Sequence, residues 1–232
     1  MAIESTDFAG FPRAMVDFLI RLEEHNDKVW FEQHRDEFIR SLQEPLQELV
    51  VALTPCMLAI DPEFEVAPRT DKTICRIYTD TRFSRDKSPY RTNMWITFKR
   101  PSSEWQGEPA FYFDVSATGY SSDMGCYSPP RSVMDAFRAL VSHAPDEFRK
   151  AIGCLDGPYG FEVGGERYKR AVAGAPEGLE SWFEYKSFYI HRDSPTDDRL
   201  FSPGLAEYLA EGFAALAPLY HCLWIASERG QR

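Results

Sequence analysis

The sequence predicts an α+β fold, in which an antiparallel sheet is flanked by helices. Apolar side chains recur every three or four residues near both ends of the chain, which is typical of amphipathic helices. Between about residues 73 and 127, apolar and polar residues alternate with a period of two, which is typical of antiparallel strands with one buried face. No internal repeat and no linker separates two cores, so we expect one domain over residues 8–227. It should have an N-terminal α-hairpin and a long C-terminal helix.

The N-terminal quarter of the chain predicts the α-hairpin. Pro12 suits the first position of an amphipathic helix, because its missing N–H has no partner there anyway. Asp27 can cap a second helix, which carries the adjacent rings of Trp30 and Phe31, and we expect both rings to pack in the core. Pro45 should kink or restart this second helix, after which the apolar stripe resumes. The hairpin is therefore expected in two or three pieces.

Period-two alternation predicts the strands that follow. They are expected over residues 73–80, 93–100 and 110–117, and a further hairpin is allowed over 120–127. The apolar face that should contact the α-hairpin consists of Cys75, Ile77, Phe113 and Val115. On the other face we expect polar side chains, among them Tyr112 and Asp114.

The C-terminal half predicts a return to helices. Apolar stripes indicate helices over residues 130–143 and 145–154. Residues 156–178 are rich in Gly and Pro and weakly patterned, so we expect an ordered surface excursion there. A strand over residues 186–192 and the long final helix over residues 202–226 complete the prediction.

The bulk composition argues against some classes of partner. The chain of 232 residues has a net charge of −10, which disfavours adhesion to DNA or to an anionic membrane surface. Its five cysteines are odd in number, widely spaced and without a C-x-x-C pair, so we expect free thiols, no disulfide and a cytoplasmic location. We also expect no signal peptide and no membrane-spanning segment, because the longest apolar stretch is short and interrupted.

Motifs for the common nucleotide, hydrolase and metal sites are absent from the sequence. No glycine-rich phosphate loop, no G-x-G-x-x-G and no G-x-S-x-G occurs. The five histidines never pair four residues apart, and there is no H-E-x-x-H. We therefore expect neither a cofactor nor a metal ion. A buried position is also the simpler explanation of Cys75, although a thiol near positive charge can be reactive.

The strongest functional signal is the segment of residues 69–91, which we call the basic island. It holds seven basic and three acidic residues, in a chain that is acidic as a whole. Local potential rather than net charge attracts an anion, and interleaved hydroxyl groups can add hydrogen bonds to phosphate or carboxylate. The side chains expected to bind the ligand are Arg76, Tyr78, Arg82, Ser84, Lys87, Ser88, Tyr90 and Arg91.

Three hypotheses follow from the basic island. It can bind a small phosphorylated or carboxylated molecule, with Asp80 or Asp86 orienting the cations or acting as a general base in an enzyme. It can instead dock an acidic protein segment or an RNA backbone. It can also be purely structural, a lattice of ion pairs that joins the helices to the sheet. No catalytic residue beyond these two carboxylates can be named, and neither the substrate nor the oligomeric state follows from the sequence.

Several segments together resemble the DUF2461 family, a domain of unknown function. They are Trp30-Phe31, the run from Arg76 to Arg91, the strand Phe111-Tyr112-Phe113, and the later basic stretch Tyr168-Lys169-Arg170. The resemblance covers roughly residues 8–225 and implies a shared cytosolic α+β fold without an assigned activity. One departure stands out, since residues 124–129 keep a single glycine, Gly125, where the family tends to have a glycine-rich turn. If that turn approaches a ligand, this chain should bind it differently.

Overall fold

The computed structural model of the chain describes residues 8–80, 82, 87–170 and 172–231. Within these residues the α+β class is confirmed, since helices accompany one antiparallel sheet of five strands. The strands are β1 Asn93–Phe98, β2 Pro109–Ser116, β3 Gly119–Cys126, β4 Glu162–Arg167 and β5 Tyr185–Pro195. Their order in the sheet is β1-β2-β3-β5-β4.

The α-hairpin forms in several pieces, as predicted. These are α1 Ala14–Glu24, α2 Lys28–Gln33, α3 Arg35–Phe38, a π-helical turn Ile39–Gln43 and α4 Glu44–Ile60. The carboxylate of Asp27 caps α2 by accepting hydrogen bonds from the backbone N–H groups of Val29 at 2.7 Å and Trp30 at 3.0 Å. Pro45 lies in the first turn of α4, directly after the π-helical turn, so the helix restarts at the predicted point.

The predicted strand over residues 73–80 is not a regular strand. Only isolated bridges form, from Ile74 to Thr70 and to Ile96 of β1, and from Tyr78 to Tyr90. Ile74 and Ile77 are both buried, whereas a regular strand would turn them to opposite faces. The two-residue alternation expected over residues 73–80 was therefore wrong. The segment first pairs with β1 and then with its own return arm, which breaks the period of two.

The surface excursion expected over residues 156–178 contains a strand that was not predicted, β4. This strand pairs with β5 alone, in antiparallel register, with Gly164 opposite Tyr189. Its sequence EVGGER is polar and holds two glycines, so it lacks the apolar alternation that marks a half-buried strand. Gly165 has a φ of +142°, and a Cβ there would lie 2.1 Å from the carbonyl oxygen of Ser187. An edge strand of this kind is fixed by its partner rather than by its own pattern.

The remaining helices match the prediction closely, apart from one short addition. They are α5 Arg131–His143, α6 Pro145–Ile152, the unpredicted α7 Glu180–Phe183, and α8 Gly204–Gly230. Helix α8 is long and apolar enough to cross a membrane by those two criteria alone, which the core helix of a soluble protein meets as well. Its side chains at Leu209, Phe213 and Tyr220 are buried.

The chain divides into two compact units, each assembled from three separate segments. Unit 1 holds Met1–Phe98, Tyr112–Ser122 and Asp193–Glu211, and unit 2 holds Lys99–Phe111, Asp123–Arg192 and Gly212–Arg232. Strands β2, β3 and β5 and helix α8 each contribute residues to both units. The single domain expected over residues 8–227 stays a prediction.

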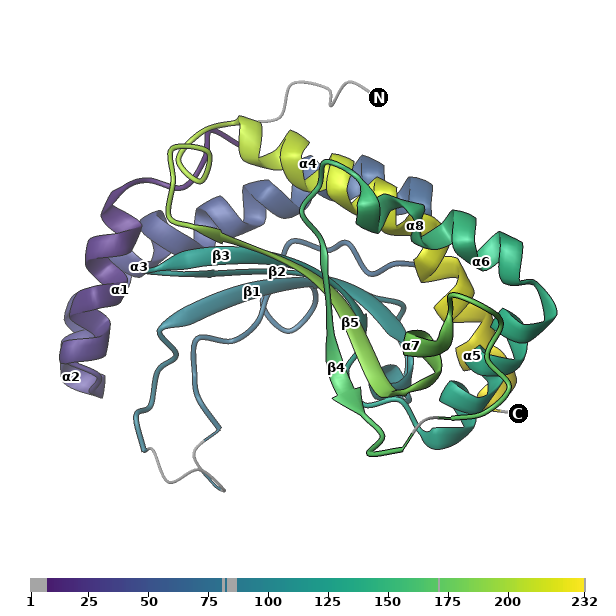
Figure 1. Cartoon of the computed structure of the whole chain (residues 1–232). Coiled ribbons are helices and arrows are strands. Elements are labelled where there is room, and N and C mark those ends of the chain that lie inside the picture. Colours follow the sequence, from purple (N-terminus) through teal and green to yellow (C-terminus); the bar gives the residue numbers. More distant parts are fainter. Residues whose placement is uncertain (1–7, 81, 83–86, 171, 232) are drawn as a thin grey trace. The chain divides into compact units, whose positions relative to one another are not determined.

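Unit 1 packs its helices on the apolar face of β1 and β2. Met94, Ile96 and Phe98 of β1 are buried on one face, and α4 contacts this strand. The rings of Phe11 and Phe113 stack with their centroids 6.1 Å apart. Figure 1 shows α4 on one side of β1, while the basic island extends away from the strand on the other side. Ile74, Ile77 and Tyr90 of the island are nevertheless buried, so the base of the island belongs to the core.

Unit 2 has its own core, which holds a buried arginine. The ring of Phe137 contacts those of Phe148 and Phe188, with centroids 5.4 and 5.1 Å apart. Next to them, Arg138 of α5 donates hydrogen bonds to the carbonyl oxygens of Phe183 at 3.1 Å and Tyr185 at 2.6 Å. These bonds fix α5 to α7 and to the start of β5.

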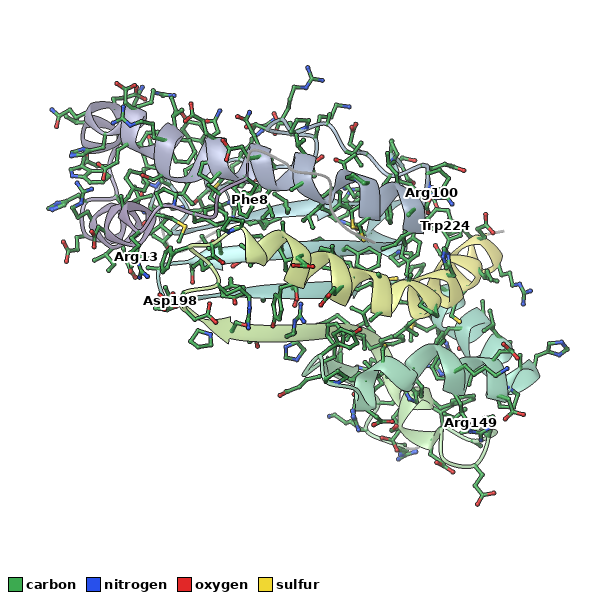
Figure 2. The ribbon with its side chains drawn as sticks, turned by 90° about the horizontal axis from the view of Figure 1, so that it is seen from above. Phe8, Arg13, Arg100, Arg149, Asp198 and Trp224 are labelled. Carbon is green, nitrogen blue, oxygen red and sulfur yellow. The ribbon has the colours of Figure 1, made fainter. Side chains whose placement is uncertain are left out.

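A second arginine of unit 2 packs on an aromatic ring. The guanidinium carbon of Arg100 lies 3.9 Å from the ring centroid of Trp224 on α8. Figure 2 labels both residues near the end of that helix. A cation over an indole is attracted by the negative face of the ring, so this contact joins the segment after β1 to α8 within the unit.

Candidate functional site

The basic island is anchored to the corner between α1 and α2 by a single side-chain amide. The Asn26 Nδ2 group donates to the carbonyl oxygen of Tyr90 at 2.8 Å, and the Tyr90 N–H donates to Asn26 Oδ1 at 3.0 Å. The Tyr90 ring is buried and stacks on Phe31 with the centroids 4.0 Å apart. This amide and this stack together hold the return arm of the island on the N-terminal helices.

The two arms of the island are tied to each other by backbone hydrogen bonds. The N–H of Thr79 donates to the carbonyl oxygen of Pro89 at 2.9 Å, and that of Arg91 donates to Ile77 at 2.8 Å. The ring of Tyr78 is half exposed and lies beside Tyr90, with the centroids 5.3 Å apart. None of these contacts involves a charged side chain.

Arg35, the first residue of α3, contacts the island. Its guanidinium group donates two hydrogen bonds to the Glu32 carboxylate, at 2.6 and 3.0 Å, and also bonds to the hydroxyl of Tyr78. The bonds to Glu32 and then to Tyr78 raise the pKa of Arg35. The tyrosine hydroxyl is thereby held in place by a cation that belongs to another element.

The two arginines at the centre of the prediction pair with neighbouring carboxylates at the surface. Arg76 pairs with Asp71, and Arg82 forms a two-pronged pair with Asp80 at 2.7 to 3.3 Å. The side chains of Arg76 and Arg82 are 66% and 77% exposed. The hydrogen bonds from Arg82 lower the pKa of Asp80 to about 2. Exposed pairs of this kind contribute little to stability.

Beside the island, the polar face of β1 and β2 carries a second group of side chains. The Arg91 guanidinium carbon lies 4.9 Å from the ring centroid of Trp95. The Asn93 Nδ2 group donates to Asp114 Oδ2 at 2.6 Å, across from β1 to β2. Burial raises the pKa of Asp114 above its usual range, and the bond from Asn93 offsets only part of that effect.

The thiol of Cys75 lies between these groups and is not activated. Burial raises the pKa of Cys75 to about 11, and the Trp95 N–H donates to its sulfur at 3.2 Å. Both Arg91 and Asp114 interact electrostatically with this thiol. Since the thiol is protonated at neutral pH, it serves as a packing and hydrogen-bonding group rather than as a nucleophile.

The structure places the predicted ligand residues at different depths. Three of them are exposed, namely Arg76, Arg82 and Lys87. Tyr78, Ser88 and Arg91 are half-exposed or half-buried, and Tyr90 is buried. Ser84 and Asp86 lie outside the described residues. Arg82 pairs with Asp80, and the charge of Arg91 also acts on this carboxylate. Arg76 pairs instead with Asp71 and makes no hydrogen bond to the other predicted residues that are described.

The sequence that forms this site also matches a known protein family. A family model described as "Conserved hypothetical protein (DUF2461)" matches residues 14–222, from α1 into α8 and including the whole basic island. The chain belongs to the DUF2461 family. A search of curated proteins found no match. The family match therefore gives this DUF2461 protein a shared fold and no activity.

Sequence reasoning missed three residues that shape the site of this DUF2461 protein. These are Asn26, Arg35 and Asn93, which orient Tyr90, Tyr78 and Asp114 respectively. Asn26 and Tyr90 are 64 positions apart, so no local pattern connects them. The only signal in the sequence was the position of Asn26, which ends one helix before the next begins. Asp114 was expected on the polar face of its strand, and it lies there.

The described part of this DUF2461 protein also contains hollows away from the island, in unit 1. A cavity of about 680 Å³ is lined partly by Arg13, Arg40, Glu44 and Asp198. Arg13 donates to Asp198 at 2.5 Å, and Figure 2 shows the two side chains meeting at the surface. The lining of this cavity carries both positive and negative side chains, so the cavity has no preference for an anion. Among the described residues, no group of three or more His, Cys, Asp or Glu side chains could hold a metal ion.

The glycine that departs from the family pattern has a structural explanation. Gly125 lies inside β3 rather than in a turn. A Cβ at this position would lie 2.8 Å from the Cα of Tyr189 and 2.9 Å from the carbonyl oxygen of Phe188. The close neighbour is therefore the backbone of β5.

Gly125→Ala is accordingly expected to destabilise the protein. Neither backbone atom can move without shifting β5, so we expect a loss of about 1–3 kcal/mol in the free energy of unfolding, as for other overpacked sites. Chemical denaturation measures it, with Gly153→Ala as the control, because a Cβ at Gly153 meets nothing within 4 Å. Equal stability of the two variants would contradict the close packing of β3 on β5.

Asp114→Asn is expected to stabilise the protein at neutral pH and not at acidic pH. The folded-state pKa of Asp114 is raised, so its ionisation costs more in the folded than in the unfolded state. This penalty is fully present above the folded pKa and vanishes below the ordinary value of 3.8. The asparagine keeps an acceptor for Asn93. Melting temperatures at pH 7 and pH 3.5 measure the effect, and a variant less stable than the parent at pH 7 would refute it.

Proposed function

We propose that the basic island binds a small anionic molecule that carries a phosphate or carboxylate group. Arg82, Lys87 and Arg91 are the cations that would hold the anion, together with Arg76 where the ligand reaches it. The proposal rests on the exposed Arg82 and the half-buried Arg91, whose charges both act on Asp80. Neither the reaction nor its class is part of the proposal.

The main support for the proposal is that the groups that anchor the island are largely different from the arginines that it exposes to solvent. Most groups that hold the island in place are neutral, namely the Asn26 amide, the stack of Tyr90 on Phe31 and the backbone bonds between the arms. The charged exceptions are Arg35, which bonds to Tyr78, and the pair of Lys72 with Glu65 at 3.0 Å. The arginines instead point to solvent from this fixed frame. An ion-pair lattice that held the fold together would need its charges inside the contact. Their exposure therefore favours binding over a structural lattice.

The ion pairs at the surface of the island are of a kind in which a bound anion can replace the aspartate. An exposed pair between arginine and aspartate is weak, because water solvates both partners well. A phosphate offers a guanidinium group two parallel hydrogen bonds and a higher charge than a carboxylate. Phosphate can therefore displace Asp80 from Arg82 and gain a second contact from Arg91, whose charge already reaches Asp80.

Binding of inorganic phosphate to purified protein tests the proposal. Calorimetric titration should detect a site that Arg82→Ala weakens by roughly 5- to 150-fold, while the melting temperature without phosphate changes little. Arg131→Ala is the control, because Arg131 is also an exposed arginine paired with an aspartate, on α5. Unchanged phosphate affinity in Arg82→Ala would refute the proposal, as would a collapse in stability without phosphate.

The carboxyl of Asp80 gives an independent signal from the unaltered protein. Its pKa of about 2 depends mainly on hydrogen bonds from Arg82. Saturating phosphate should raise this pKa toward 3.8, because the anion takes the guanidinium group and adds a like charge. Carboxyl NMR during a pH titration measures it. If phosphate fails to bind while a single-stranded RNA or an acidic peptide binds in an Arg82-dependent way, the island is a docking surface and the small-molecule proposal is wrong.

A further inference from the structure

The basic island continues into the polar face of β1 and β2 within unit 1. Arg91 connects the two, because its guanidinium carbon lies 4.9 Å from the ring centroid of Trp95, which projects from the same face of β1 as Asn93. Asn93 in turn donates to Asp114 of β2 at 2.6 Å. Arg91 and the Asp114 carboxyl therefore border the same polar face of β1 and β2.

Asp114 is a carboxyl group without a cationic partner among the described residues. Its Oδ2 atom accepts the Asn93 amide hydrogen, and its Oδ1 atom has no hydrogen-bond partner there. Burial opposes its ionisation, so a donor that reaches Oδ1 would be favoured. The Asn93 amide fixes the carboxyl plane and leaves its own carbonyl oxygen as a second acceptor. This pair is a preformed acceptor for hydrogen-bond donors.

The charges around the pair restrict the donor that can approach. An ammonium or guanidinium group would meet repulsion from Arg91 and the rest of the basic island. An anionic group would meet repulsion from Asp114 itself. A neutral hydroxyl group can donate to Oδ1 without either cost. The indole ring of Trp95 projects from the same face of β1 as Asn93 and lies 4.9 Å from the Arg91 guanidinium carbon, so it keeps that cation beside the Asn93–Asp114 pair.

We propose that the ligand is a phosphorylated polyol or sugar. Its phosphate meets the basic island, and its hydroxyl groups donate to Asp114 and Asn93. This inference rests on the proposed function and adds to it a substrate class and two residues outside the island.

Comparison of inorganic phosphate with ribose 5-phosphate tests the inference by titration calorimetry. Ribose 5-phosphate should bind about tenfold more tightly or better, since charge-assisted bonds from hydroxyl groups add to the phosphate contact. Asp114→Ala and Asn93→Ala should remove that advantage and leave the affinity for inorganic phosphate unchanged or slightly higher. Asp146→Ala, which removes an exposed carboxylate of α6, is the matched control.

A measurement on the unaltered protein keeps the test valid if a variant fails to fold. Inorganic phosphate should raise the pKa of Asp114 through its like charge, whereas hydroxyl donors favour the ionised carboxylate. The pKa of Asp114 by carboxyl NMR should therefore be lower with ribose 5-phosphate than with inorganic phosphate.

The outcomes separate the two proposals. If neither compound binds, the proposed function itself fails. If phosphate binds in an Arg82-dependent way but ribose 5-phosphate binds no more tightly, only the sugar phosphate inference is overturned. An equal effect of Asp114→Ala on both compounds, or an equal pKa of Asp114 with both, also overturns it.

Discussion

Arg138→Ala is expected to lower the free energy of unfolding by about 3–5 kcal/mol, as the loss of a buried charged partner does. The Arg138 side chain is buried and donates to two carbonyl oxygens, those of Phe183 and Tyr185, and to the Asp135 carboxylate at 2.8 Å. Truncation would leave both carbonyl oxygens without their donor, and each such loss costs roughly 1–3 kcal/mol. Urea denaturation followed by circular dichroism measures the change.

The same helix provides the control for Arg138. Arg131 pairs with the same Asp135 carboxylate at 3.4 Å, but its side chain is 84% exposed. Arg131→Ala should therefore cost at most about 1 kcal/mol, as exposed ion pairs do. A cost similar to that of Arg138→Ala would show that the pair with Asp135, and not the buried bonds to the backbone, sets the stability.

Phe31→Ala is expected to cost about 3–5 kcal/mol and also to weaken phosphate binding. The Phe31 ring is fully buried, lies 5.4 Å from the ring of Phe38, and supports Tyr90 of the basic island. Its loss leaves a cavity directly under the return arm of the island. Denaturation and phosphate titration on the same variant measure the two effects.

Trp30→Ala is the neighbouring control, because this ring is only half-buried and stacks on His34, with the centroids 4.0 Å apart. A smaller loss of stability and unchanged phosphate binding are expected. If Phe31→Ala unfolds the protein, Phe31→Leu preserves most of the volume and should retain the fold with weaker phosphate binding. Full phosphate affinity in Phe31→Leu would argue against the support of the island by this ring.

The sequence predicted those elements whose own side chains determine their structure. The α-hairpin and strands β1 and β2 carry apolar residues at the correct period, so one buried face specified each of them. Residues 73–80 showed the same period and still did not form a strand. Their pairing depends on two different partners, β1 and the return arm at Tyr90, and a local pattern cannot show where one partner ends. Strand β4 lacked the pattern altogether.

The candidate site could be located from the sequence but not assembled. Clustered charge identified the basic island, because composition is visible without any fold. The groups that orient its side chains come from distant elements, as Asn26 does for Tyr90 and Asn93 for Asp114. The pairing of Arg76 with Asp71 and of Arg82 with Asp80 also needed coordinates, since each arginine has several acidic neighbours in sequence.

Because each unit is assembled from separate segments of the chain, neither unit can fold until its last segment has been synthesised. Unit 1 needs Asp193–Glu211 as well as the N-terminal segment, and unit 2 needs Gly212–Arg232. Domains usually fold in turn as they leave the ribosome. Here the helices of the α-hairpin are made early, but unit 1 cannot be completed until its last segment, Asp193–Glu211, has emerged. During that interval we expect the apolar faces of α1 and α4 to be incompletely covered in the nascent chain.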